Sequence, residues 1–295
     1  MQERYVIETD HARVVVETRR GAKLSSLLHK QTAREWLLQA HGADHRVPGY
    51  GSIFTDAPLS GWDEMLPSVD ACVYPADPYR GVEIPDHGEV WAVPWQVEDV
   101  SPTSVTCSVR GRALPYRLTR SLELAGPDLT ASYELCVIGD NELSLLWAPH
   151  PQYAMRAGTV LTFPIGVEHL TAVTEGRPGS ARQQRIPAEG LDCAQLVPRG
   201  GGLTLYTIPG MTTDRAELRD RDGCWLRMVW NSEELPYLAV WMDNGSYAAS
   251  APVVCLEPMT GYYDDLSRAY RQGRVLVVEP GQPARWSVHV ALGTY

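Results

Sequence analysis

The chain has 295 residues, of which 44% are hydrophobic, and a formal net charge of −10 at pH 7. This acidic balance argues against a nucleic-acid backbone or an anionic membrane surface as partner, because both attract a basic face. No stretch approaches the roughly 20 apolar residues of a membrane span and the first residues lack a signal-peptide pattern, so we expect a soluble, cytoplasmic protein.

Runs with two-residue alternation of apolar and polar side chains recur along the chain, separated by Gly, Pro, Asp or Asn. Such alternation is typical of strands, in which successive side chains point to opposite faces of a sheet. In chain order, we predict strands over residues 4–9, 12–18, 90–100, 104–109, 116–124, 129–138, 143–150, 203–208, 224–230, 237–242, 253–258, 274–280 and 284–292.

Helical patterns are scarce. The best short helix spans residues 264–273, with Asp264 or Asp265 near its N-cap and Gly273 at its end. The polar stretch 174–192 is expected to be a surface loop, and no change in composition marks a domain linker. Many strands with little helix predict an all-β protein, a large antiparallel β-sandwich that forms a single domain over residues 1–295.

The six cysteines are scattered, and none forms a CxxC pair. Several lie in predicted strands, so we expect free, mostly buried thiols in a reducing compartment. A zinc site built on cysteine is not expected, because the usual ligand spacing is missing. They are residues 72, 107, 136, 193, 224 and 255.

Glu257 ends an apolar run, residues 251–256, that is otherwise suited to burial. In a strand, Val253, Cys255 and Glu257 share one face and the residues between them share the other. Neither face is polar, which indicates a strand covered on both sides. A buried carboxylate must be paired, hydrogen-bonded or protonated, and such groups often lie at functional sites. Taken alone, Glu257 is better explained as a salt-bridged carboxylate at a strand end.

His87 precedes Gly88 and an apolar run that contains Trp91 and Trp95. The glycine lets the backbone turn, or lets a ligand approach closely. Taken alone, His87 is best explained as a loop histidine beside a core strand. His87 and Glu89 are also both metal-ligand types at positions i and i+2, but two residues are a weak signal.

His150 follows the apolar run 143–149 and precedes Pro151, which places it at a strand edge. A structural role explains it when it is taken alone. The chain also has nine tryptophans, most of which should form the core. Trp62 and Trp147 lie beside the motifs and are the better candidates to face a sugar, because the apolar faces of sugars stack on indole.

Together, two histidines and a carboxylate at strand edges of one sandwich can converge on one face. Reversible opening of a cyclic hemiacetal requires a base that removes the proton of the anomeric hydroxyl. It also requires an acid that protonates the ring oxygen. A carboxylate opposite an imidazole supplies both groups.

The order of three motifs resembles the aldose 1-epimerase (galactose mutarotase-like) family. The matching segments are "DHGEVW" at 86–91, "WAPHPQY" at 147–153 and "CLEPMTG" at 255–261. The first corresponds to the family's His-Gly before an aromatic strand, here His87-Gly88. The second corresponds to its mid-chain histidine with an aromatic residue, here His150 with Tyr153. The third corresponds to its C-terminal glutamate, here Glu257. The resemblance covers nearly the whole chain in order and spacing.

This resemblance implies a large β-sandwich, or supersandwich, with an open cleft on one sheet. It implies that Glu257 is the general base at the anomeric hydroxyl and that His150 is the general acid at the ring oxygen. His87 would bind the sugar and help polarise that oxygen. The family needs no metal and no organic cofactor, so none is expected here.

The chain departs from the family where many relatives carry an arginine before the HG motif. Here residues 61–70 read "GWDEMLPSVD". Asp63 or Glu64 could bind sugar hydroxyls instead, because carboxylates accept hydrogen bonds from neighbouring hydroxyl groups. The identity of the sugar, whether neutral, acidic or phosphorylated, stays open.

Three other functions remain open at this stage: a non-catalytic sugar-binding module, a glycoside hydrolase or lyase, and a cupin-like metal enzyme. Hydrolysis usually needs two facing carboxylates, for which Asp63 or Glu64 could partner Glu257. The expected partner is a small-molecule sugar, with no nucleic acid and no membrane. Edge strands can pair between subunits, which leaves a homodimer open.

Overall fold

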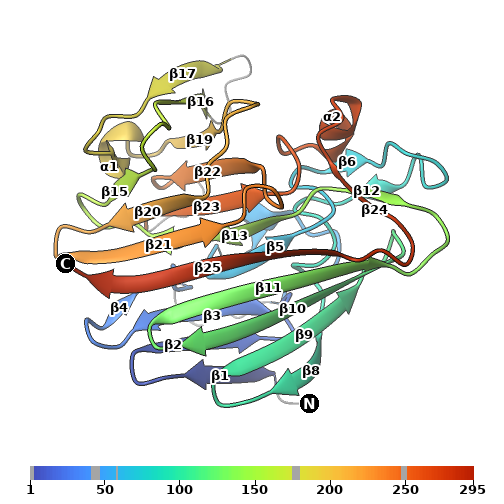
Figure 1. Ribbon diagram of the computed structural model, residues 1–295, viewed down its shortest axis with the longest axis horizontal. Coiled ribbons are helices and arrows are strands. Elements are labelled where there is room, and N and C mark those ends of the chain that lie inside the picture. Colours follow the sequence, from blue (N-terminus) through green and yellow to red (C-terminus); the bar gives the residue numbers. More distant parts are fainter. Residues whose placement is uncertain (1–2, 41–46, 58, 175–179, 247–250) are drawn as a thin grey trace.

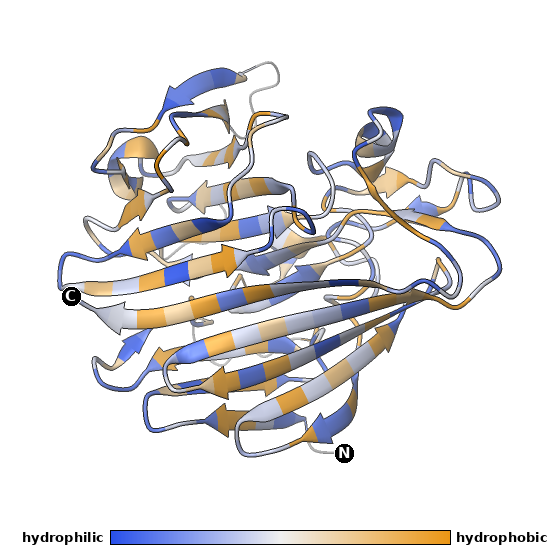
Figure 2. Ribbon diagram, viewed as in Figure 1, coloured by the Kyte–Doolittle hydropathy of each residue, from blue (hydrophilic) through white to orange (hydrophobic). Residues whose placement is uncertain are grey.

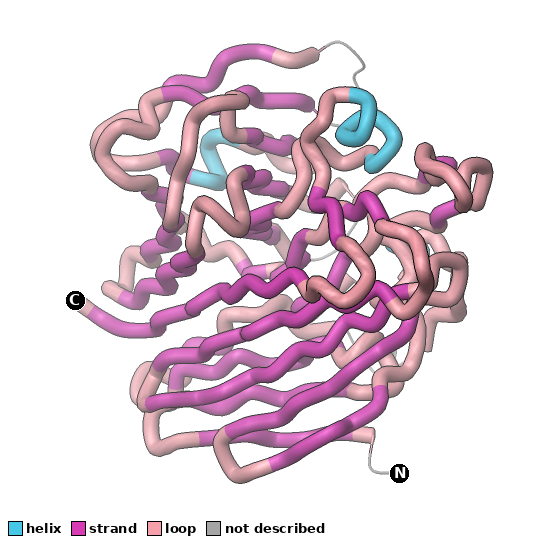
Figure 3. The backbone as a smooth tube through the Cα atoms, turned by 45° about the vertical axis from the view of Figure 1, so that its right-hand side comes forward, coloured by secondary structure: helices cyan, strands magenta, loops and turns pink. Residues whose placement is uncertain are grey.

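The structure, a computed structural model, describes residues 3–40, 47–57, 59–174, 180–246 and 251–295 (Figure 1). Strands dominate it, and neighbouring strands pair antiparallel throughout these ranges. Within them, helix is limited to α1 (Cys193–Leu196), α2 (Leu266–Arg271) and the 3₁₀ turn Phe54–Asp56, and Figure 3 shows how little of the chain they occupy. The predicted all-β antiparallel class is confirmed.

The largest sheet has nine strands in the spatial order β18–β15–β20–β21–β25–β11–β10–β9–β8. Burial alternates along its long central strands, and Figure 2 shows the matching alternation of hydropathy. One face of this sheet therefore packs on the core and the other faces solvent. Its strands are β8 (Gln96–Val100), β9 (Ser104–Arg110), β10 (Tyr116–Ala125), β11 (Asp128–Val137), β15 (Val160–Thr162), β18 (Leu191–Asp192), β20 (Arg215–Arg219), β21 (Cys224–Trp230) and β25 (Ala284–Thr294).

Two six-stranded sheets meet where β13 lies beside β23. The first runs β1–β2–β3–β5–β13, with β4 paired to β3, and the second runs β14–β23–β22–β19–β16–β17. The first comprises β1 (Arg4–Glu8), β2 (Ala12–Glu17), β3 (Lys23–His29), β4 (Arg34–Glu35), β5 (Trp62–Met65) and β13 (Ala148–Pro151). The second comprises β14 (Tyr153–Ala154), β16 (His169–Thr174), β17 (Arg182–Arg185), β19 (Gly202–Tyr206), β22 (Tyr237–Asp243) and β23 (Val253–Met259).

Two short ribbons complete the described structure. One pairs β12 (Leu143–Leu145) with β24 (Leu276–Val278), and the other pairs β6 (Cys72–Val73) with β7 (Glu83–Ile84). Among the described residues, no helix has the length and apolar character that would be needed to cross a membrane.

Strand β23 is buried along its whole length, as the sequence predicted. Val254 and Leu256 join the main hydrophobic cluster, whereas Val253 and Cys255 pack in a separate small cluster with Leu38. Its two faces therefore contact different parts of the interior. All six cysteines are unpaired thiols, which also agrees with the prediction.

Several predicted elements are wrong in detail. Residues 90–95 are not a strand, because β8 begins at Gln96. The indoles of Trp91 and Trp95 instead donate to the carbonyl groups of Asp86 and Val90, which holds this segment as a loop. The predicted strand 143–150 is divided between β12 and β13, which belong to different sheets.

The predicted surface loop 174–192 contains β17 and β18, although residues 175–179 of it lie outside the described residues. Strands β5, β15, β16 and β20 were not predicted. The predicted helix is confirmed as α2, and the side chain of Asp265 caps it by accepting from the Arg268 amide at 2.9 Å.

A buried ion pair joins the sheets in the core. Arg120 of β10 donates to Glu64 of β5 at 2.7 Å, and neither side chain is exposed by more than 1%. Glu64 also accepts from the Tyr133 hydroxyl at 2.9 Å and from the Trp147 indole at 3.0 Å. These contacts satisfy the carboxylate, which a buried charge requires.

Removal of Arg120 tests this structural role of Glu64. Arg120→Met should lower the free energy of unfolding by about 3–5 kcal/mol, because it leaves a buried carboxylate without its cation. Urea denaturation followed by circular dichroism measures the change. Arg80→Met, which removes the exposed pair with Asp77, is the control and should change stability little. Equally small losses of unfolding free energy in both variants would contradict a stabilising role of the Arg120–Glu64 pair.

Candidate active site

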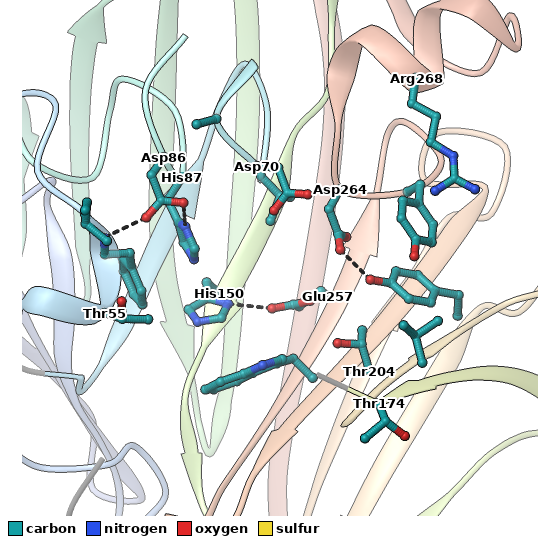
Figure 4. Close-up of a pocket in the computed structure, with 18 of the residues that line it drawn as sticks. Thr55, Asp70, Asp86, His87, His150, Thr174, Thr204, Glu257, Asp264 and Arg268 are labelled. Atoms are coloured by element: carbon teal, nitrogen blue, oxygen red, sulfur yellow. Dashed lines mark hydrogen bonds and ion pairs between the residues drawn. The ribbon is translucent and has the colours of Figure 1, made fainter. Parts of the chain in front are cut away.

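A cavity of about 810 Å³ opens where the two six-stranded sheets meet. β13 contributes His150, β23 contributes Glu257, β22 contributes Trp241, and the loop that contains His87 closes one side (Figure 4). Its volume lies in the range of ~300–1,000 Å³ that is typical of small-molecule sites. The remaining lining residues are Ile53, Phe54, Thr55, Leu59, Val69, Asp70, Ala71, Asp86, Val173, Thr174, Ser180, Ala181, Thr204, Tyr206, Tyr263, Asp264 and Arg268.

His150 and Glu257 contact each other directly in this cavity. Nδ1 of His150 lies 2.5 Å from Oε1 of Glu257, and both residues are only 5% exposed. The pairing of β13 with β5 sets His150 opposite Asp63, and the pairing of β23 with β22 sets Glu257 opposite Ala239. Because β13 lies beside β23, two segments separated by 107 positions in the sequence bring an imidazole and a carboxylate together.

Burial lowers the pKa of His150 to about 3, because an imidazolium loses hydration inside the protein. The neighbouring His87 lowers that pKa further, whereas the Asp63 and Asp86 carboxylates raise it. His150 is therefore a weak base that, once protonated, is a stronger acid than an ordinary histidine.

His87 is held by its backbone as well as by its side chain. Its φ is +58°, its amide donates to the Val69 carbonyl at 2.7 Å, and Gly88 follows with a φ of +75°. A Cβ at Gly88 would lie 2.0 Å from the Leu66 carbonyl oxygen, so only glycine fits at this close approach. This constraint explains the HG sequence and turns the imidazole toward the cavity.

Aromatic rings surround the two imidazoles. The ring of Phe54 stacks on His87 with centroids 4.0 Å apart and packs edge-on against His150 at 5.0 Å. The centroids of His87 and His150 lie 5.3 Å apart, and the Trp241 indole lies 5.4 Å from His150. An indole beside the reactive pair is suited to the apolar face of a sugar.

The far end of the cavity carries a second polar group. Tyr206 donates its hydroxyl to Asp264 and stacks on Tyr263 at 4.7 Å, and the Arg268 guanidinium lies 4.0 Å from the Tyr263 ring centroid. Burial raises the pKa of Tyr206 well above its usual value, and Asp264 raises it further, so this phenol stays protonated. Burial also raises the pKa of Asp70, which lines the same cavity.

The structure brings together His87, His150 and Glu257 from the sequence-predicted set. The other five are buried in the core and are not among the residues that line this cavity: Trp62, Asp63, Glu64, Trp147 and Tyr153. Asp63 forms an ion pair with Lys23 at 2.8 Å, and Glu64 is held by Arg120. Their charges are neutralised by partners that the sequence pattern does not reveal.

Sequence reasoning missed Trp241, Tyr206 and Asp264 as cavity residues. Trp241 lies opposite Cys255 in the β22–β23 register, which sets it on the same face as Glu257. The strands themselves were predicted, but not which strands pair or in which register. Of the two residues predicted near the helix N-cap, Asp265 performs the capping, and Asp264 contacts Tyr206.

His150, Cys255 and Glu257 are the described residues grouped closely enough to hold a metal ion, with ligand atoms within 4.8 Å of one another. The Cys255 thiol fits this role poorly. Burial raises its pKa well above the usual value, with a further contribution from Glu257, and metal ions bind the thiolate. The absence of a metal cofactor stays a prediction.

No family model matches the chain, and no curated protein matches its sequence. Solved structures match over almost its whole length. The Slr1438 protein from Synechocystis sp. PCC 6803 has a TM-score of 0.77 at 17% identity, covering 99% of this chain and 96% of that one. A galactose mutarotase related enzyme from Lactobacillus acidophilus has a TM-score of 0.75 at 14% identity, covering 99% and 97%. The chain has the galactose mutarotase-like fold.

A galactose mutarotase-like protein from Lactobacillus casei ATCC 334 agrees, with a TM-score of 0.74 at 16% identity and coverage of 98% and 100%. At this identity the comparisons establish the galactose mutarotase-like fold and not the reaction.

Substitution of Gly88 tests the close approach that positions His87. Gly88→Ala should lower the free energy of unfolding by more than about 3 kcal/mol, because strain at positive φ adds to the clash with Leu66. Gly126→Ala is the matched control, since Gly126 has a φ of +61° with no atom within 4 Å of the added Cβ. It should cost only about 1 kcal/mol. Thermal denaturation of both variants measures the loss of stability. Equal losses in the two variants would contradict the close approach of Gly88 to Leu66.

Proposed function

We propose that the protein interconverts the α and β anomers of a free reducing sugar by acid–base opening and closure of the sugar ring. The observation that carries this proposal is the 2.5 Å contact between His150 and Glu257 in a cavity of small-molecule size. The galactose mutarotase-like fold of the chain supports it. The neighbours with that fold include a galactose mutarotase related enzyme.

The anomeric hydroxyl O1 and the ring oxygen O5 are both bonded to C1 of the sugar. Adjacent groups such as Glu257 and His150 can therefore reach both oxygens at once. Glu257 takes the proton from O1 as the C1–O5 bond breaks and a carbonyl forms at C1. His150 gives a proton to O5, which becomes a hydroxyl.

Rotation about the C1–C2 bond then presents the other face of the carbonyl. Closure reverses the proton transfers: His150 takes the proton back from O5, and Glu257 returns one to O1. The two residues end in their starting protonation states, so no net proton or electron is consumed. His87 lies on the same side of the cavity as His150 and can donate to the ring oxygen.

The other functions weighed from the sequence have less support. A glycoside hydrolase needs a second carboxylate opposite Glu257, but the Asp63 and Glu64 carboxylates considered for that role form ion pairs with Lys23 and Arg120 in the core. A binding module remains the second candidate, favoured by Trp241 and the tyrosines in the cavity. It would not require a buried imidazole next to a carboxylate.

Replacement of Glu257 tests the proposal. Anomer exchange is followed by NMR on neutral, acidic and phosphorylated free sugars in weakly catalysing buffer. Wild type should accelerate exchange of at least one sugar, and Glu257→Gln should lower kcat by roughly 10²–10⁴-fold, because it removes the general base. Glu279→Gln at an exposed glutamate is the control. Full activity of the Glu257 variant would reject the mechanism, and sugar binding without acceleration by wild type would favour the binding module.

The pH dependence tests the role of His150. Its pKa is lowered, so the protonated form needed of a general acid is lost as pH rises above that value. The kcat/KM of the wild type, corrected for the uncatalysed rate, should then fall about tenfold per pH unit between roughly pH 6 and pH 8. A flat profile over that range would show instead that neutral His150 is the active form and acts as a base.

A further inference from the structure

Asp63 lies directly opposite His150 on the neighbouring strand of the first six-stranded sheet. The two residues are partners in the antiparallel register of β5 and β13. Side chains in such positions share a face of the sheet, with their Cβ atoms about 4.5–5.5 Å apart. His150 lines the cavity, whereas Asp63 is fully buried and is not among the lining residues. The imidazole thus has a buried carboxylate as a neighbour within its own sheet.

The Asp63 carboxylate has few partners for a buried group. The Lys23 ammonium lies 2.8 Å from Oδ2 and also donates to the Ser60 carbonyl at 2.6 Å. Apart from this ion pair, neither carboxylate oxygen has a hydrogen-bond partner within the described part of the chain. Glu64, the next residue along β5, accepts hydrogen bonds from three side chains. The contrast calls for an explanation, because unsatisfied buried polar atoms are rare in proteins.

A protonated His150 supplies the positive charge that Asp63 lacks. Charges attract each other more strongly in the protein interior than in water, because the interior has a lower dielectric constant. Burial is the largest influence on His150 and lowers its pKa to about 3. Against that background, Asp63 raises the pKa of His150 and Lys23 lowers it. The ion pair therefore acts on the imidazole with two opposed charges.

The remaining titratable groups that face His150 line the cavity or lie beside it. The Cys255 side chain stays a thiol, because burial raises its pKa well above the usual value. Asp63 and Lys23 are absent from the cavity lining, so they can act on His150 without touching a sugar. The other groups are Glu257 of β23 and, from the loop on the opposite side, Asp86 and His87.

We propose that Asp63 and Lys23 are positioning residues for the proton of His150: the carboxylate stabilises the imidazolium, and the ammonium limits that stabilisation so that the imidazolium stays a strong acid. This inference rests on the proposed function for the role of His150 as the general acid. The electrostatic coupling between the ion pair and His150 does not depend on that role.

The balance of the two charges suits a group that must both hold and release a proton. Beside the carboxylate alone, His150 would bind its proton too firmly to give it readily to O5 of the sugar. Beside the ammonium alone, the imidazolium would rarely form. Asp63 and Lys23 exchange no proton with the sugar themselves. The proton that reaches O5 comes from His150 and returns to His150 on ring closure.

Lys23→Met tests the coupling, because it removes the cation and leaves the carboxylate. The pKa of His150 should rise by roughly one to two units, since the Asp63 charge is no longer offset. Nitrogen-15 NMR follows the ring from about pH 8 to pH 4, with the signals assigned from their loss in His150→Gln and folding checked by circular dichroism. The variant should titrate within this range, and wild type only below it. An unchanged pKa of His150 in the variant would overturn the proposal.

Further variants assign the effect to the ion pair. Lys23→Arg should titrate as wild type does, because it keeps the positive charge. Adding Asp63→Asn to Lys23→Met should abolish the rise, and a rise that persists would overturn the role of Asp63. Lys30→Met, which removes a partly exposed pair with Glu8, is the matched control and should leave the His150 signals unchanged. If Lys23→Met does not fold, Lys23→Gln carries the same test, because its amide can still donate to the Ser60 carbonyl.

The pH dependence of activity gives a second readout. The pH above which kcat/KM falls should rise in Lys23→Met by as much as the pKa of His150, and Lys23→Arg should restore the wild-type profile. A raised pKa with an unshifted profile would overturn the role of the pair in the reaction. If wild type accelerates no sugar, the proposed function fails, and the NMR titration still decides whether the ion pair acts on His150.

Discussion

The side-by-side approach of β13 and β23 is the constraint on which the site depends. Each strand belongs to a different six-stranded sheet, and each carries one member of the reactive pair. The pairing of β13 with β5 and of β23 with β22 fixes both strands along most of their length. A one-residue slip in either register would turn His150 or Glu257 to the opposite face. The geometry of the His150–Glu257 pair is thus set by two sheets rather than by loops.

Carboxylates of the interior lie in two kinds of environment, the core and the cavity. In the core, carboxylates meet cations: Asp63 pairs with Lys23, Glu64 with Arg120, and Asp220 with Arg34. In the cavity, the partners of Asp86 and Glu257 are imidazoles, which can gain or lose a proton, unlike a guanidinium. Fixed cations stabilise the framework, whereas titratable partners leave protons available for chemistry. The distinction separates structural from reactive carboxylates in one chain.

Much of the fold could be predicted from the sequence, because alternation records which face of a strand is buried. The two faces of β23 and the helix before Gly273 follow directly from local pattern. His87, His150 and Glu257 were found from their motifs and order. Asp63, Glu64 and Trp62 are buried in the core; local sequence shows that a residue lies near a motif but not which way its strand faces. Lys23 and Arg120, which neutralise those carboxylates, are distant in the sequence.

Strand β17 has a consequence for association between copies of the chain. It forms the outer edge of its sheet and reads Arg-Gln-Gln-Arg, with both arginines exposed. If two copies joined these edges antiparallel about the centre of the strand, Arg182 of each would face Arg185 of the other. Like charges directly opposite each other are unfavourable in a sheet, and there is no apolar side chain in the strand to compensate. The charges on this edge therefore disfavour pairing of β17 with the same strand of a second copy of the chain.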